Sequence, residues 1–175
     1  MAGKEKGKII IGVIMGSDSD YPVMAEAVRM LEKFGIGCEV EVVSAHRSPA
    51  RAAEYAETAL RRGLKAIIVG AGGAAHLAGV VAALTTLPVI GVPMGGTAAN
   101  GMDSLLSTVQ MPGGVPVGTM AIGKAGAMNA GIYAAEILAT SDAEIARKLG
   151  EYKKELDSAV AEKSARLKRE IAEKK

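Results

Sequence analysis

Short apolar runs alternate with longer amphipathic stretches along most of this chain. The runs are rich in Val and Ile, which is typical of strands, and they lie at residues 9–15, 39–43, 66–70, 88–92 and 116–122. Helical spacing of apolar residues predicts helices over residues 21–34, 49–62, 76–86, 103–110 and 125–139, and we expect the last, almost wholly apolar one to be buried on most sides. Apolar strands that alternate with helices form parallel sheets covered on both faces. We therefore expect a doubly wound α/β domain with five strands.

The C-terminal segment, residues 141–175, has a different pattern. Ser141–Asp142–Ala143–Glu144 fits the capping box that begins a helix. The stripe positions that follow recur at steps of three and four residues, which predicts one amphipathic helix of about 30 residues, on the order of 45 Å long; they are Ile145, Leu149, Tyr152, Leu156, Val160, Lys163, Leu167 and Ile171. A small α/β domain is not wide enough to cover such a helix. We expect residues 1–140 to form the catalytic domain, with residues 1–8 disordered, and residues 141–175 to form an arm on a neighbouring subunit; the alternative is a solvated helix.

Composition and charge exclude several classes of protein. Apolar residues make up 49% of the 175 residues, which excludes a disordered chain, and 3% aromatic residues cannot supply stacking platforms for single-stranded nucleic acid. The net charge of +2 is too weak to argue for nucleic-acid binding. The single cysteine, Cys38, excludes an internal disulfide and a multi-thiolate metal site. With no apolar run long enough for a membrane span, we expect a cytoplasmic protein with no nucleic-acid or membrane partner.

The candidate chemistry lies in three loops that follow the first three predicted strands. Ligands of open parallel sheets bind outside the carboxyl ends of the strands. The loops read Gly-Ser-Asp-Ser-Asp at residues 16–20, Ser-Ala-His-Arg-Ser-Pro at 44–49 and Ala-Gly-Gly-Ala-Ala-His-Leu at 71–77. They contain both histidines of the chain, His46 and His76. We therefore expect a binding site at this edge of the sheet.

In the first two loops, each candidate residue has a functional and a purely structural interpretation. Hydroxyls of Ser17 and Ser19 beside a helix start would bind an anion, or Ser19 or Asp20 would simply cap the helix. In the second loop, His46 can transfer a proton near neutral pH and Arg47 can clamp a phosphate or carboxylate. The alternative is an exposed His–Arg pair on a turn.

The third loop combines glycines with the second histidine. Gly72 and Gly73 would let a ligand approach the backbone closely. His76 either takes part in the site or only bonds loop carbonyls.

Residues 70–75 fit a dinucleotide fingerprint, but no acidic residue lies between Glu57 and Asp103 to bind the ribose. Residues 118–125 nearly match a P-loop, but Ala125 replaces its Ser or Thr. We expect no metal and no cofactor.

Several motifs together resemble the PurE family, the phosphoribosylaminoimidazole carboxylases of de novo purine synthesis. They are MGSDSD at residues 15–20, SAHRSP at 44–49, GAGGAAHL at 70–77, GVP at 91–93, DSLLSTVQMPGGVPVGT at 103–119 and AIGKAGAMNAG at 121–131. The resemblance implies a flavodoxin-like three-layer αβα sandwich with parallel strand order 2-1-3-4-5. It also implies a homo-octamer that acts on a small ribonucleotide. The chain departs from the family pattern at Ala78–Gly79–Val80 and in the small, glycine-rich loop Met94–Asn100.

The family has two branches. Mutases move the carboxylate of N5-carboxyaminoimidazole ribonucleotide to ring carbon C4, and the other branch carboxylates aminoimidazole ribonucleotide directly with CO₂. Arg47 after His46 and the third loop, Gly73–Ala74–Ala75–His76, resemble the mutases. The resemblance implies that His46 is the general acid and base. It implies that the following residues bind substrate, with the phosphate on Arg47 and the Ser17/Ser19 loop: Ser17, Ser19, Asp20, Ser44, Ala45, Arg47, Gly72, Gly73, Ala74, His76 and Leu77.

Three other functions remain open. One is the direct CO₂-dependent carboxylase. Another is a flavin-binding module of the same fold, although the chain has no Trp to stack on a flavin ring. The third is a nucleotide sensor that binds the ribonucleotide without catalysis and tolerates replacement of His46.

Overall fold

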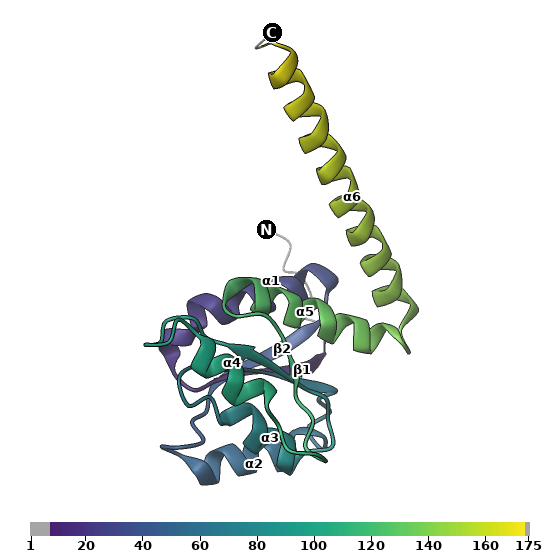
Figure 1. The fold of residues 1–175 in the computed structure, drawn as a ribbon. Helices are drawn as coiled ribbons and strands as arrows, with labels where there is room; N and C mark the ends of the chain where they lie inside the picture. The colour runs from purple at the N-terminus through teal and green to yellow at the C-terminus, as the bar shows by residue number, and fades with distance from the viewer. Residues whose placement is uncertain (1–7, 174–175) are drawn as a thin grey trace.

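The structure is a computed structural model that describes residues 8–173, and it alternates strands with helices (Figure 1). The expected disorder of residues 1–8 therefore falls, except for Lys8, outside the described residues. The strands are β1 (Ile9–Met15), β2 (Gly37–Val42), β3 (Ala66–Ala71), β4 (Val89–Pro93) and β5 (Gly118–Thr119). The helices are η1 (Asp18–Asp20), α1 (Tyr21–Phe34), α2 (Pro49–Ala59), α3 (Leu77–Leu84), α4 (Met102–Val109), α5 (Lys124–Ala139) and α6 (Ala143–Ala172).

All five strands run parallel in one sheet, in the order β2-β1-β3-β4-β5. Helices α1 and α5 cover one face of the sheet, and α2, α3 and α4 cover the other (Figure 1). Each face has its own buried cluster: Ile11, Val13 and Ile68 face α1 and α5, whereas Ile14 and Ile67 face α2 and α3. The predicted flavodoxin-like sandwich and its strand order are confirmed.

Small residues let α5 pack closely on α1. A Cβ atom on Gly131 would lie 2.7 Å from the carbonyl oxygen of Ala27, so only glycine fits there. The expectation that this apolar helix is buried on most sides is wrong, because only its small-residue face meets α1. On its other side, Met128 and Tyr133 are 36% and 42% exposed.

Several element boundaries differ from those that the pattern predicts. The predicted strand 116–122 is reduced to Gly118–Thr119, because Pro116 has no N–H to donate and the chain beyond Thr119 follows β4 only through isolated hydrogen bonds. The predicted helix 49–62 ends at Ala59. Gly63 takes a left-handed conformation with φ +96°, and this turn leads the chain into β3. Strand β2 begins at Gly37, two residues before its predicted start.

The long C-terminal helix is confirmed, but its cap is not Ser141. The Asp142 carboxylate accepts the backbone N–H groups of Glu144 and Ile145, so the helix is capped one residue later than the predicted capping box requires, and that box does not form. The first turns pack on the domain: Ile145 and Leu149 are buried. Farther along, α6 extends away from the domain (Figure 1), and four apolar side chains are 49–65% exposed: Leu156, Val160, Leu167 and Ile171.

Candidate active site

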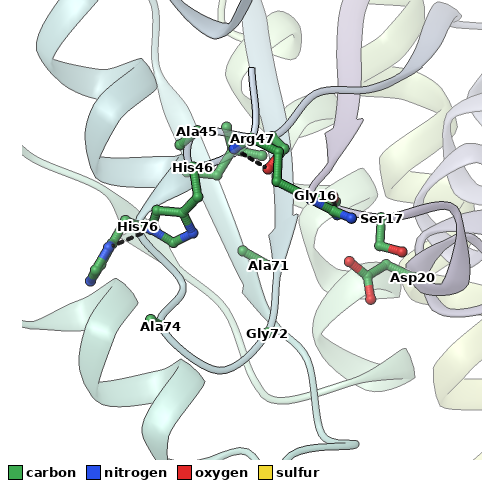
Figure 2. Close-up of a pocket in the computed structure, with 12 residues that line it drawn as sticks. Gly16, Ser17, Asp20, Ala45, His46, Arg47, Ala71, Gly72, Ala74 and His76 are labelled. Atoms are coloured by element: carbon green, nitrogen blue, oxygen red, sulfur yellow. Dashed lines mark hydrogen bonds between the residues drawn. The ribbon is translucent and has the colours of Figure 1, made fainter. Parts of the chain in front are cut away.

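The loops after β1, β2 and β3 enclose a cavity of about 380 Å³ (Figure 2). Strand β1 lies between β2 and β3, so the direction of strand order reverses beside it, which is where sheets of this class bind ligands. The volume lies in the range of small-molecule sites. The cavity is lined by Gly16, Ser17, Asp20, Ser44, Ala45, His46, Arg47, Ala71, Gly72, Ala74, His76 and Leu77.

The structure brings together all the predicted site residues except Ser19 and Gly73, which do not line the cavity. Two lining residues, Gly16 and Ala71, were not predicted. Gly16 directly follows β1, and Ala71 ends β3. Their small size at the strand ends leaves room for the cavity. Each is the first residue of one of the predicted loops, and this position is the signal that could have identified them.

The two histidines of the chain contact each other in this cavity. Nε2 of His46 lies 2.8 Å from Nδ1 of His76, and the rings meet edge to face with centroids 4.9 Å apart (Figure 2). One of the two nitrogens donates and the other accepts, according to the tautomer. His76 thus bonds His46 rather than a loop carbonyl. The pair can hold and pass a proton at one wall of the cavity.

Arg47 connects two of the loops. Its guanidinium Nη2 donates to the carbonyl oxygen of Gly16 at 2.8 Å, and its backbone N–H donates to Ser44 Oγ at 3.2 Å (Figure 2). A second bond holds the same turn, because the backbone N–H of Ser48 donates to the Ser44 carbonyl at 3.0 Å. The bond to Gly16 uses one of five guanidinium N–H donors. The side chain is therefore held at the cavity with donors left to meet an anion.

The first loop forms the opposite wall. Ser17 caps η1: its Oγ accepts the backbone N–H of Ser19 at 3.3 Å and the Ser19 hydroxyl at 2.8 Å. The predicted cap by Ser19 or Asp20 is therefore wrong: Ser17 is the side-chain cap, of η1, and neither of the other two caps a helix with its side chain. Burial raises the pKa of the Asp20 carboxyl above its ordinary value, and a hydrogen bond from the Ser17 backbone offsets part of the rise.

The walls of the cavity differ in chemistry. Imidazoles that can move a proton stand on one side, and a guanidinium, hydroxyls and a carboxylate stand on the other, which suits an anionic ligand that also carries hydroxyl groups. Within residues 8–173, no three His, Cys, Asp or Glu side chains gather in a way that could hold a metal ion. None of the described helices is long and apolar enough to cross a membrane.

Known proteins are similar to this chain in sequence and in fold. The family model described as AIR carboxylase matches residues 10–159. A Thermotoga maritima protein described as N5-carboxyaminoimidazole ribonucleotide mutase is 59% identical over 157 residues, which cover 90% of this chain and 91% of the relative. A Bacillus subtilis protein of the same description is 58% identical over 158 residues, covering 90% of this chain and 98% of the relative.

A solved structure extends the similarity to three dimensions. The crystal structure of Treponema denticola PurE matches with a TM-score of 0.82 at 27% sequence identity, and the match covers 91% of this chain and 98% of that one. The family match includes all three loops that line the cavity and ends within α6. On sequence and fold together, the chain belongs to the AIR carboxylase family.

Proposed function

We propose that this protein is an N5-carboxyaminoimidazole ribonucleotide mutase of purine biosynthesis, an isomerase that moves a carboxylate from the exocyclic nitrogen to ring carbon C4. The observation that carries the proposal is the identity of 58–59% with relatives of that description over 90% of this chain. The cavity supports it, because the reaction needs a group that exchanges protons beside a site for a phosphorylated ligand.

His46 is the proposed general acid and base. It protonates the nitrogen that bears the carboxylate, the N–C bond breaks, and CO₂ is released within the cavity. Carbon C4 then attacks the CO₂ to form the new C–C bond, and the imidazole takes back the proton that C4 loses. The proton given in the first step is thus recovered in the last. The contact with Nδ1 of His76 supports this role, since it orients the ring and offers a second proton acceptor.

The ribonucleotide binds along the first two loops in this proposal. Arg47 and the Ser17/Ser19 hydroxyls meet the phosphate, and the carboxylate of Asp20 accepts hydrogen bonds from ribose hydroxyls. Gly72 and Ala74 form the wall against which CO₂ is held between the two steps. Their small side chains leave room for it, and confinement keeps CO₂ from escaping into water.

The direct carboxylation of aminoimidazole ribonucleotide by CO₂ is a second candidate, favoured by the description of the matching family as AIR carboxylase. It differs from the mutase reaction in its starting material. The mutase needs no added bicarbonate, whereas the direct carboxylase has no source of the new carboxylate without it.

One pair of assays tests both candidates. The protein is given synthetic N5-carboxyaminoimidazole ribonucleotide without ATP, metal or bicarbonate, and separately aminoimidazole ribonucleotide with saturating bicarbonate. We expect rapid formation of the C4-carboxylated product in the first assay and much slower formation in the second. The reverse order of rates would establish the direct carboxylase, and binding without turnover in both would indicate a nucleotide sensor.

We also propose that the protein is a homo-oligomer larger than a dimer, namely the homo-octamer that the family resemblance implies. The exposed apolar stripe on α6 supports this proposal, since apolar side chains that are half exposed along a long helix favour burial against a partner. The cytoplasmic location and the division of the chain at residue 140 stay predictions.

A further inference from the structure

Helix α4 holds the backbone of the glycine loop after β3, although α4 does not line the cavity. The backbone N–H of Gly73 donates to Ser104 Oγ at 2.9 Å, and the Ser107 hydroxyl, which donates to the Asp103 carbonyl at 2.7 Å, lies 3.4 Å from the Gly73 carbonyl oxygen. Ser104 is fully buried, with 0% of its surface exposed. The N–H of Gly73, a residue with φ +64°, is thus bonded to a side chain of α4, whereas its carbonyl accepts the backbone N–H of Ala75 at 2.9 Å.

Asp103 holds Ser104 in turn. Its Oδ1 accepts the Ser104 backbone N–H at 2.9 Å and the Thr97 hydroxyl at 2.5 Å. Thr97 belongs to the glycine-rich loop after β4, and its methyl group lies 3.6 Å from the position that a Cβ on Gly72 would take. A continuous chain of contacts therefore runs from Thr97 through Asp103 and Ser104 to the Gly72–Gly73 peptide.

We infer that Ser104 is a positioning residue of the mutase reaction, and that it acts by fixing the orientation of the Gly72–Gly73 peptide at the cavity wall. In a trans peptide the N–H and the C=O point in opposite directions. Because the Gly73 N–H points to Ser104, the carbonyl of Gly72 points away from α4. Without Ser104 Oγ, the Gly73 N–H loses its partner and a rotation of this peptide becomes favourable.

The inference rests on the proposed function. The released CO₂ is proposed to be held against Gly72 and Ala74, so a rotated Gly72–Gly73 peptide changes the shape of the wall at which the new C–C bond forms. The nucleotide part of the substrate binds on the other two loops. The peptide orientation therefore affects the chemical step more than substrate binding.

Ser104→Ala removes the hydroxyl and leaves the rest of the side chain. We expect kcat to fall between about tenfold and a hundredfold, because a small misplacement of the residues that line the reaction site slows the chemical step, with KM changed less than about threefold. Amide hydrogen exchange of Gly73 should become faster in the same variant. The matched control is Thr108→Val, which removes another buried hydroxyl of α4 that donates only to the helix carbonyl of Ser104, at 2.7 Å.

We expect both variants to lower the melting temperature by similar amounts, while only Ser104→Ala lowers kcat. Equal losses of kcat in the two variants, or an unchanged kcat in Ser104→Ala, would overturn the inference. If Ser104→Ala does not fold, Ser104→Cys, which keeps a side chain of similar shape with a weaker acceptor for the Gly73 N–H, should give a smaller loss of kcat at unchanged KM, and no loss would overturn the inference. The wild-type assay separates the two proposals. An inactive wild-type protein contradicts the proposed function, whereas the exchange rate of the Gly73 amide in Ser104→Ala tests the positioning bond independently of activity.

Discussion

In the proposed reaction, some side chains at the carboxyl edge of the sheet transfer protons and others bind the substrate. His46 and His76 touch each other, whereas Arg47 is bonded to the loop after β1 and Asp20 lies half-buried on the opposite wall. Groups that act only in the chemical step change kcat, and groups that hold the substrate throughout change KM. Substitutions at these positions should therefore have different kinetic signatures.

His46→Asn removes the proton-transfer group and keeps a polar side chain of similar size. We expect kcat to fall by about 10² or more, the usual contribution of general acid–base catalysis, while the substrate still binds. Steady-state kinetics gives kcat, and calorimetry on the variant gives the dissociation constant. His76→Asn is the matched control, with a smaller expected loss because His46 remains. A His46→Asn enzyme with near-normal turnover would refute the acid–base assignment.

Arg47→Ala removes the guanidinium that is proposed to hold the phosphate. A phosphate contact stabilises the bound substrate and the transition state alike, so we expect KM to rise by at least tenfold and kcat to change much less. Arg51→Ala, which removes an exposed arginine whose guanidinium pairs with Glu41 outside the cavity, is the control and should leave both constants unchanged. A large fall in kcat at constant KM would instead put Arg47 at the reacting carboxylate.

The carboxyl of Asp20 should make KM depend on pH in the acidic range. Burial raises its pKa above the ordinary value of 3.8, so the group becomes protonated at a higher pH than an exposed aspartate. The carboxylate form is present above this raised pKa and is lost as the pH falls through it. The proposed hydrogen bonds from the ribose hydroxyls need the carboxylate form as acceptor. We therefore expect KM to rise as the pH falls through this acidic range. In Asp20→Asn, KM should be higher and this pH dependence absent; an unchanged pH dependence would assign it to another group.

Helices and strands follow local sequence signals closely where their apolar spacing is regular. Helix α1 and strand β1 lie where the pattern predicts them, with bounds at Tyr21–Phe34 and Ile9–Met15. The largest errors occur at β5 and at the end of α2, where proline, glycine and contacts with other strands decide the boundary. The start of α6 is a third case, because two adjacent residues are both good caps.

Asp142→Ala tests the observed cap of α6. The carboxylate bonds two backbone N–H groups in the first turn, so its removal should lower the free energy of unfolding by about 1 kcal/mol. Ser141→Ala is the matched control, because the Ser141 hydroxyl makes only a 3.4 Å bond to the Leu138 carbonyl. Urea denaturation measures both variants. A larger loss for Ser141→Ala would restore the capping box that the sequence pattern predicts.

At the scale of the whole molecule, α6 has two parts with different surroundings. Its first turns bury Ile145 and Leu149 against the domain, and its remaining turns extend outward (Figure 1). Leu149, Val160 and Ile171 recur every 11 residues, a period that keeps an apolar stripe nearly parallel to the helix axis. The stripe therefore faces one direction along the exposed length, as contact with a single partner requires.

Two truncations separate these parts. A chain that ends after Lys154 keeps the buried residues and loses the exposed stripe, so we expect it to remain folded and to form smaller assemblies than the intact protein. A chain that ends after Thr140 also loses Ile145 and Leu149 and should melt at a much lower temperature. Light scattering at micromolar concentration gives the mass of each. A monomeric intact protein, or identical assembly of the Lys154 truncation, would show that the arm is solvated.

The class of fold and most of the residues that line the cavity could be predicted from the amino-acid sequence alone. Alternating apolar strands and helices predicted the parallel sheet, and polar residues directly after the first three strands predicted the wall residues, because parallel strands end at one edge. The contacts between distant segments became visible only in the three-dimensional fold. The bond between His46 and His76, and that of Gly73 with Ser104, join residues about 30 positions apart, and local propensity carries no information about such pairs. Likewise, apolarity predicted that α5 and α6 bury a surface, but the packing of neighbouring elements decided which side is buried within the chain and which side remains exposed.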